Sequence, residues 1–163
     1  MSTATSWKPS YAQTVTPYLI IKDCAKALEL YKSAFGAEEV HRICAPDGKI
    51  MHAFLKFGDS NIYFCDEMGD PKCGASPSTL GNCHATMHIF VEDVDKAFQK
   101  AVDAGCTPFL PPTDMFWGDR YSSVRDPFGQ VWSLATHKLD LSVEEMQKAG
   151  NEFFKNMEAC AAK

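Results

Sequence analysis

In both halves of this chain, an apolar strand-like run is followed by a segment in which hydrophobic residues recur at helical spacing. Apolar, strand-like runs at Pro17–Ile21 and Met87–Val91 each lead into a segment with helical spacing. The apolar positions of these two helical segments are Ala27, Leu28, Tyr31, Ala34 and Phe35 in the first half and Val94, Ala97, Phe98, Ala101 and Val102 in the second. Each stripe predicts an amphipathic helix with one buried side.

The two helical segments also begin and end alike. Asp23 and Asp93 precede them at an offset of about 70 residues, and each is a suitable N-cap. Gly36 and Gly105 follow them, where a left-handed residue commonly ends a helix. The match through cap, helix and stop indicates an internal repeat.

Three strand-like segments follow each helix, separated by turns rich in Gly, Pro and Asp. We expect these strands at Glu38–Cys44, Ile50–Phe57 and Asn61–Asp66 in the first half, and at Thr107–Leu110, Arg120–Arg125 and Gln130–Thr136 in the second. The order strand, helix, three strands occurs twice. The sequence therefore predicts an α+β fold of two βαβββ modules.

The expected organisation has five parts. Residues 1–13 form a flexible tail, 14–66 the first module, 67–82 a linker, 83–137 the second module and 138–163 a C-terminal helix. Ser142 and Glu145 form a capping box for that helix. Its apolar positions are Val143, Met146, Phe153, Met157 and Cys160. This stripe packs on its own domain or contributes to a homodimer interface, and the sequence leaves both open.

Composition excludes several classes of protein. The 163 residues carry a formal net charge of −5 with acidic and basic residues interspersed, which argues against nucleic-acid binding. No apolar run approaches the length of a membrane span, and the N-terminal residues lack the apolar core of a secretory signal. The seven cysteines show no C-x-x-C spacing, which is typical of reduced thiols in a cytoplasmic protein.

Several segments resemble one protein family. Thr16–Leu19, Ala27–Ala37, Phe116–Tyr121, Asp126–His137 and Leu141–Met146 are similar to the PhnB-like branch of the vicinal oxygen chelate superfamily, which includes glyoxalases and bleomycin-resistance proteins. The Asp-Pro-x-Gly turn at Asp126 is common to the superfamily, and Trp117-Gly-Asp-Arg-Tyr121 is more specific to the branch. The resemblance implies two modules with mixed curved sheets that form a partly open barrel around a cleft.

Metal-dependent members of this superfamily chelate a divalent ion with four inward side chains, one from the first and one from the last strand of each module. Carried over through the repeat, the resemblance assigns these positions to Thr16, Phe64, Thr86 and Ser133. None is a good ligand for Zn²⁺, Ni²⁺ or Fe²⁺, which prefer imidazole, thiolate or carboxylate. We therefore expect no metal at these positions and no other cofactor.

Histidines offer a different arrangement. His84 and His88 lie two residues before and two residues after Thr86, so strand alternation puts both on the same face of the strand as Thr86. His52, in the third strand of module one, is a third candidate, and Asp66 or Glu67 could add a carboxylate. Histidines four apart along a strand are about 13 Å apart, so only one of the pair could share an ion with His52. The alternative is a set of hydrogen-bonded pocket residues.

Two further side chains follow a proline-rich segment that predicts a mouth loop or an edge strand. Trp117 could stack on a flat ligand and Arg120 could bind an anionic one, or Trp117 could pack under the loop while Arg120 pairs with Asp119 or Asp126. His137, after the last strand, is either a proton-transfer group or a surface residue.

Two functions fit these observations. The first is a protein that binds a small molecule in the inter-module cleft without the usual metal. An anionic molecule is one candidate for this ligand. The expected ligand-binding residues are Thr16, Tyr18, His52, Phe64, His84, Thr86, His88, Trp117, Arg120 and Ser133. The second is a metal-dependent lyase, isomerase or dioxygenase with a displaced site at His52 and His88. A vestigial cleft in a dimeric scaffold is a third alternative, and no catalytic residue is assigned.

Overall fold

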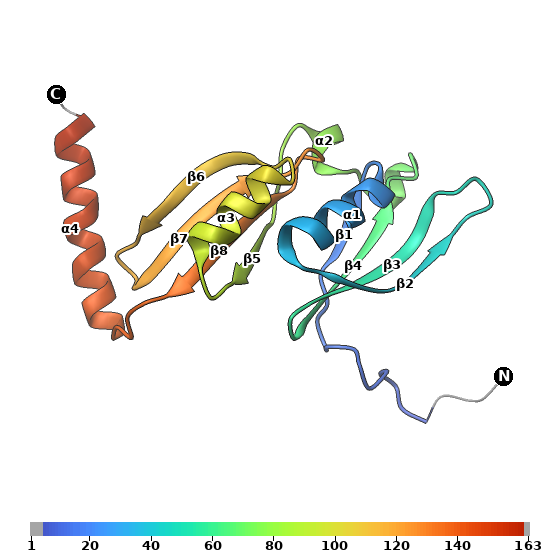
Figure 1. Cartoon of the computed structure of the whole chain (residues 1–163), viewed down its shortest axis with the longest axis horizontal. Helices are drawn as coiled ribbons and strands as arrows, with labels where there is room; N and C mark the ends of the chain where they lie inside the picture. The colour runs from blue at the N-terminus through green and yellow to red at the C-terminus, as the bar shows by residue number, and fades with distance from the viewer. Residues whose placement is uncertain (1–4, 162–163) are drawn as a thin grey trace. The chain divides into compact units, whose positions relative to one another are not determined.

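The computed structural model describes the backbone of residues 5–161 and the side chains of residues 5–70 and 72–157. It contains two compact units, one reaching from the N-terminus to His84 with Phe128–Gln130, the other comprising Ala85–Pro127 and the residues from Val131 onward. Each holds one four-stranded mixed sheet with a helix against one face (Figure 1). The predicted α+β fold of two βαβββ modules is confirmed.

The first module consists of β1 (Tyr18–Ile21), α1 (Cys24–Phe35), β2 (Glu38–Cys44), β3 (Ile50–Phe57) and β4 (Ser60–Asp66). The second consists of β5 (Thr86–Phe90), α3 (Val94–Asp103), β6 (Thr107–Asp114), β7 (Asp119–Arg125) and β8 (Val131–His137). The short helices η1 (Pro71–Cys73) and α2 (Pro77–Leu80) lie in the segment expected as a linker, and α4 (Val143–Ala161) follows the second module.

The two sheets have the same topology. Their strand orders are β1-β4-β3-β2, here called sheet A, and β5-β8-β7-β6, here called sheet B. In each, the first strand pairs in parallel with the last, and neither sheet closes into a barrel. Tyr18 is opposite Tyr63 in sheet A, and His88 is opposite Ser133 in sheet B, so both partners are displaced by the same 70 positions. The repeat read from the sequence is thus kept in the strand register.

Each helix packs one side on its sheet; α1 buries most of its predicted stripe, whereas in α3 only Val94 and Ala101 are fully buried and the other predicted positions are half-buried. In α1 the residues Cys24, Ala27, Leu28, Tyr31 and Ala34 are buried. The Tyr31 ring lies 5.3 Å, centroid to centroid, from Phe64 of β4, and both side chains are 0% exposed. Burial of each large apolar side chain of this kind contributes about 1.5–3 kcal/mol, so the helix–sheet contact is the main stabilising interface of the module.

The N-terminus of α1 is capped differently from the prediction. Asp23 has a left-handed backbone (φ 60°) and its side chain makes no capping hydrogen bond, so its assignment as N-cap acceptor is wrong. Instead Asp66, at the end of β4, accepts from the backbone N–H of Cys24 (2.9 Å) and from that of Ile50 in β3 (2.7 Å). One carboxylate thereby joins helix, third strand and fourth strand.

The second module uses the equivalent position with a different side chain. Thr136, 70 residues after Asp66, accepts from the backbone N–H of Val94 through its hydroxyl (2.8 Å) and donates to the carbonyl of Val91 (3.0 Å). Here the predicted N-cap is confirmed, because Asp93 accepts from the backbone N–H of Lys96 at 3.1 Å. Both helices therefore donate their first backbone N–H to a side chain of the last strand of their module.

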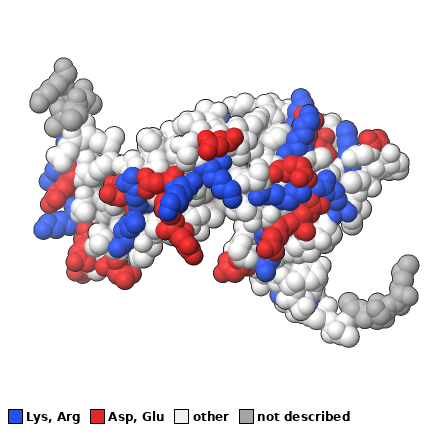
Figure 2. All heavy atoms as spheres, in the orientation of Figure 1, with Lys and Arg blue, Asp and Glu red and all other residues white. Residues whose placement is uncertain are grey.

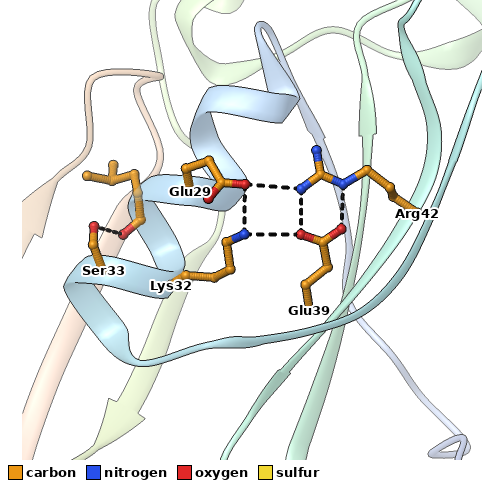
Figure 3. Close-up of polar contacts among 6 residues, drawn as sticks. Glu29, Lys32, Ser33, Glu39 and Arg42 are labelled. Atoms are coloured by element: carbon orange, nitrogen blue, oxygen red, sulfur yellow. Dashed lines mark hydrogen bonds and ion pairs between the residues drawn. The ribbon is translucent and has the colours of Figure 1, made fainter.

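A β-bulge changes the facing of side chains in β2. The register with β3 shifts between Glu39 and His41, so Val40 is the extra residue. As a result Glu39 and Arg42, three apart, both face α1, where they form an ion-pair network with Glu29 and Lys32 (Figure 3). Lys32 Nζ lies 2.7 Å from Glu29 and 3.3 Å from Glu39, and Arg42 contacts both carboxylates.

The last helix stands largely apart from the second sheet (Figure 1). Its capping box is confirmed: the backbone N–H of Glu145 donates to Ser142 Oγ (3.2 Å), and that of Ser142 to Glu145 (2.8 Å). Its contact with the module runs through Phe116, whose ring packs on Gly150 and lies 5.5 Å from the Phe153 ring. Val143 and Met157 stay 77% and 55% exposed, and the side chain of Cys160 lies outside the described residues.

The structure can also be compared with what the composition indicates about charge distribution and membrane spans. Basic and acidic side chains are interspersed over the visible face of the molecule (Figure 2). None of the helices within residues 5–161 combines the length and the apolar character that a membrane span requires.

The ion-pair network predicts the effect of Glu39→Gln. Hydrogen bonds from Arg42 and Lys32 hold the pKa of Glu39 below its usual range, so its contribution is complete above the unfolded pKa and is lost as the pH falls through the folded one. We expect Glu39→Gln to lower the free energy of unfolding by about 1 kcal/mol at pH 7. The difference from the parent should begin to shrink as the pH falls below the usual glutamate value of about 4.3, and should be clearly smaller at about pH 3 than at pH 7. Denaturant titrations at both pH values, with the exposed Glu38→Gln as control, measure this.

The double cap predicts a larger cost for Asp66→Ala. Removing the carboxylate leaves two backbone N–H groups without their acceptor, so the free energy of unfolding should fall by about 1–3 kcal/mol. Asp66→Asn, which keeps one carbonyl oxygen, should lose less. Urea unfolding compares these with Asp59→Ala, an exposed turn substitution. Equal losses for Asp59→Ala and Asp66→Ala would contradict the capping role.

Candidate functional site

The face of sheet B away from α3 collects aromatic and polar side chains. We call His88, Phe90, Phe109, Tyr121, Ser123, Arg125 and Ser133 the open face of sheet B. Strand alternation and the register put the members from β5, β7 and β8 on the side opposite Arg120, which pairs with Asp95 of α3. Phe109 of β6 joins them through its contact with Arg125. Phe90 and Phe109 are 62% and 64% exposed, an unusual display of two large apolar rings on one sheet face.

His88 is the centre of this face. Its Nδ1 lies 2.8 Å from Ser133 Oγ on the neighbouring strand. Its ring is nearly parallel to that of Tyr121, with centroids 6.0 Å apart and an interplanar angle of 13°, and meets the Phe90 ring edge-on at 4.8 Å. The predicted residues His88 and Ser133 are therefore brought together. The imidazole is held in place by a hydroxyl and two rings.

Arg120 does not lie on this face. Its guanidinium binds both carboxylate oxygens of Asp95 at 2.7 and 2.8 Å and also contacts Asp114 at 3.1 Å. The assignment of Arg120 to the ligand-binding face is therefore corrected: this even-numbered position of β7 faces the helix. Its expected structural partners, Asp119 and Asp126, were also the wrong ones.

Arg125 is the arginine that shares a face with His88. It lies at an odd-numbered position of β7 like Tyr121, and its guanidinium carbon lies 5.5 Å from the centroid of the Phe109 ring. A guanidinium over an aromatic ring keeps its hydrogen-bond donors at its edge, where a carboxylate or phosphonate can be bound. The sequence signal was available, because counting along β7 from Tyr121 places Arg125 on the same side.

Trp117 and His137 are fixed by a shared carboxylate at the β6–β7 turn. Trp117 Nε1 donates to Asp119 Oδ2 at 3.1 Å, and its ring meets that of Tyr121 edge-on at 5.7 Å. His137 contacts Asp119 through Nδ1 (2.8 Å) and Asp140 through Nε2 (3.0 Å). Hydrogen bonds to Asp140 and Asp119 raise the pKa of His137. Trp117 thus supports the open face of sheet B from its rim.

The face of sheet A away from α1 is also aromatic. We call Tyr18, His41, His52, Phe54 and Tyr63 the open face of sheet A. The His52 ring lies 4.9 Å from Tyr63, 5.5 Å from Tyr18 and 5.5 Å from His41, centroid to centroid. His52 Nδ1 is 3.0 Å from the Tyr18 hydroxyl, and burial together with nearby His41 lowers the pKa of His52.

Part of this face is covered by the segment expected as a tail. The Tyr11 ring stacks on Phe54 at 5.6 Å, and the Tyr11 carbonyl accepts from Asn61 Nδ2 at 2.8 Å. Phe54 is consequently 3% exposed, whereas Tyr18 is 50% exposed. The accessible part of the open face of sheet A is therefore the histidine–tyrosine end.

Phe64 does not belong to either open face. It is fully buried against Tyr31 of α1, so its placement in the ligand-binding set is corrected. The register shows that the equivalent of Ser133 is Tyr63. The expected pairs for a metal ion are thus Thr16 with Tyr63 in the first module and Thr86 with Ser133 in the second.

These pairs do not fit a divalent transition metal. They offer only hydroxyl oxygens, and such ions prefer imidazole, thiolate or carboxylate ligands. Within the described side chains, no group of three or more His, Cys, Asp and Glu residues is arranged to hold a metal ion. His84 precedes β5, so strand alternation does not place it on the face of Thr86 and His88.

Two of the cysteines are buried in the helix–sheet cores. Cys24 is 0% and Cys106 is 4% exposed, and burial raises the pKa of each thiol to about 12. A thiol that stays protonated at neutral pH is a poor nucleophile. These two residues therefore act as core side chains.

Comparison with known proteins agrees with this architecture. The model of the Glyoxalase/Bleomycin resistance protein/Dioxygenase superfamily matches residues 11–134. The chain belongs to this superfamily. An uncharacterized protein of Mycobacterium bovis is 38% identical over 138 residues, covering 83% of this chain and 90% of the relative.

Solved structures share the fold of this glyoxalase-superfamily chain. TioX from Micromonospora sp. ML1 is 26% identical with a TM-score of 0.59, covering 80% of this chain and all of TioX. The PhnB protein from Bacillus cereus has a TM-score of 0.60 and covers 76% of this chain and 99% of its own. At 16% identity, that likeness shows the fold alone.

Proposed function

We propose that this superfamily member binds a small organic anion through the open face of sheet B, without the metal of the metal-dependent members. The observation that carries the proposal is that Arg125 and the exposed Phe109 ring share a sheet face with His88, whose own ring contacts are the exposed Phe90 and the half-buried Tyr121. Ligand sites in proteins combine apolar walls with a few polar groups that orient the ligand, and this face supplies both.

The chemistry of the face favours a flat ligand with one negative group. Exposed rings stack on planar molecules, and the edge of a guanidinium can donate two parallel hydrogen bonds to a carboxylate or phosphonate. His88 adds a hydrogen-bonding nitrogen between these two regions. Hydroxyl groups stand at the positions where metal-dependent relatives carry ligands, which supports binding rather than metal-centred chemistry.

The motifs that resemble the PhnB-like branch support a finer assignment. Trp117-Gly-Asp-Arg-Tyr121 forms the rim of the open face of sheet B, since Trp117 and Tyr121 contact each other and Asp119 binds Trp117. We include membership of this branch in the proposal. The segment would then serve to hold the rim of the ligand site, with Arg120 anchoring the strand to α3.

Ligand-dependent melting of metal-depleted protein tests the proposed binding. A panel of aromatic carboxylates and phosphonates, added after EDTA treatment, should include compounds that raise the melting temperature. Arg125→Ala should weaken their binding by about 10–100-fold, because a hydrogen bond to a charged group contributes about 1.5–3 kcal/mol. Arg120→Ala is the matched control and should leave the affinity unchanged.

Three results would overturn the proposal. The first is binding that is unaffected by Arg125→Ala but lost in Arg120→Ala, which would place the anion on the helix side of the sheet. The second is a shift that needs an added divalent metal. The third is the absence of any shift across the panel, with isothermal titration as a second measurement.

We further propose that two copies of the chain associate as a homodimer through α4. Its apolar side chains Val143, Phe154 and Met157 are 77%, 55% and 55% exposed, although they share a helix with the anchored Phe153. A group of large apolar side chains exposed on one helix commonly marks an interface. Light scattering should show a dimer, and Val143→Glu with Met157→Glu should give a monomer with unchanged circular dichroism. A monomeric parent protein would contradict the proposal.

A further inference from the structure

We propose that His41 and His52 on the open face of sheet A form a two-imidazole binding site for a divalent transition metal ion such as Ni²⁺ or Cu²⁺. Their ring centroids are 5.5 Å apart and their planes are inclined by 39°. With metal–nitrogen bonds of about 2.0–2.1 Å, two imidazoles on one ion hold their centres roughly 5 Å apart. The observed separation is therefore close to that of a chelating pair.

The bulge in β2 is what puts His41 on this face. Because Val40 is the extra residue, His41 pairs with Phe54 and shares its side of the sheet. Without the bulge, His41 would be opposite Ala53 and would point toward α1, away from His52. Bulges occur preferentially next to functional sites, where they redirect a side chain.

The ion-pair network holds this local geometry. Glu39 and Arg42 both face α1 only because one extra residue lies between them, and both bind partners on that helix. A return to regular pairing would break these contacts as well as move His41. The orientation of His41 is thus stabilised from the opposite face of the sheet.

Tyr18 orders the second histidine. A carbonyl oxygen can only accept, so the Tyr18 hydroxyl donates to the Met51 carbonyl at 3.2 Å. The same hydroxyl oxygen lies 3.0 Å from Nδ1 of His52. When both contacts are made, the tyrosine oxygen is the acceptor for His52, and Nδ1 carries the proton. The lone pair is then on Nε2, where a metal ion can bind. Metal-binding histidines are commonly fixed by such a partner on the other ring nitrogen.

The site differs from that of metal-dependent relatives in its strands and in its ligand number. His41 and His52 lie on β2 and β3, whereas the relatives use the first and last strands. Two protein ligands leave the remaining positions to water or to an organic ligand. Imidazole suits nickel, copper and zinc, and we choose Ni²⁺ as the first probe because the exposed thiols of Cys44 and Cys73 are soft ligands that favour zinc and copper.

Titration of untagged, EDTA-treated protein with Ni²⁺ tests the site. Isothermal titration should give one ion per chain. His41→Ala and His52→Ala should each weaken binding by about tenfold or more, because either leaves a single imidazole. Tyr18→Phe, which keeps the ring but removes the hydroxyl, should weaken it by about 10–100-fold. His88→Ala is the matched control on the other module and should bind Ni²⁺ like the parent.

Further readouts separate a metal site from a change in folding. His41 is exposed, so His41→Ala should melt like the parent in the absence of metal and lose the increase in melting temperature that Ni²⁺ gives the parent. Electron paramagnetic resonance of the Cu²⁺ form should show two coordinated nitrogens. Unchanged affinity in His41→Ala, or loss of binding in His88→Ala alone, would overturn the proposal. Neither result affects the anion test, which uses metal-free protein.

Discussion

The last strand of each module is the element on which the rest of the structure depends. β4 and β8 lie between the first and third strands of their sheets, paired in parallel on one side and antiparallel on the other. Each carries at or next to its last position a side chain, Asp66 or Thr136, that accepts from the first backbone N–H of the module's helix. This hydrogen bond fixes where the helix starts. The buried side of the helix then covers one face of the sheet and leaves the other open.

Much of this arrangement was predictable from local patterns. The helical stripes, the succession of strands and helices along the chain and the capping box of α4 are set by neighbouring residues, so periodicity and spacing reveal them. The cap of α1 was not, because Asp66 lies 42 positions from Cys24 and only the folded sheet brings them together. An aspartate directly before a helix is normally the better guess.

The errors at the candidate site have one common origin: side chains were assigned to the wrong face of a strand. An assignment displaced by a single residue moved the expected position from Tyr63 to Phe64, which lies on the opposite side of β4. Arg120 was favoured over Arg125 because it belongs to a recognisable motif, although alternation from Tyr121 selects Arg125. His41 was missed because a bulge cannot be read from the alternation that it interrupts.

The edges of the sheets have a consequence for how copies of this protein can meet. β6 is an outer strand of sheet B and contains Pro108, Pro111 and Pro112, none of which has an N–H to donate to another strand. β2, an outer strand of sheet A, is kinked by its bulge. Both borders therefore resist continuous pairing with a neighbouring molecule, which leaves strand addition to the short outer strands β1 and β5.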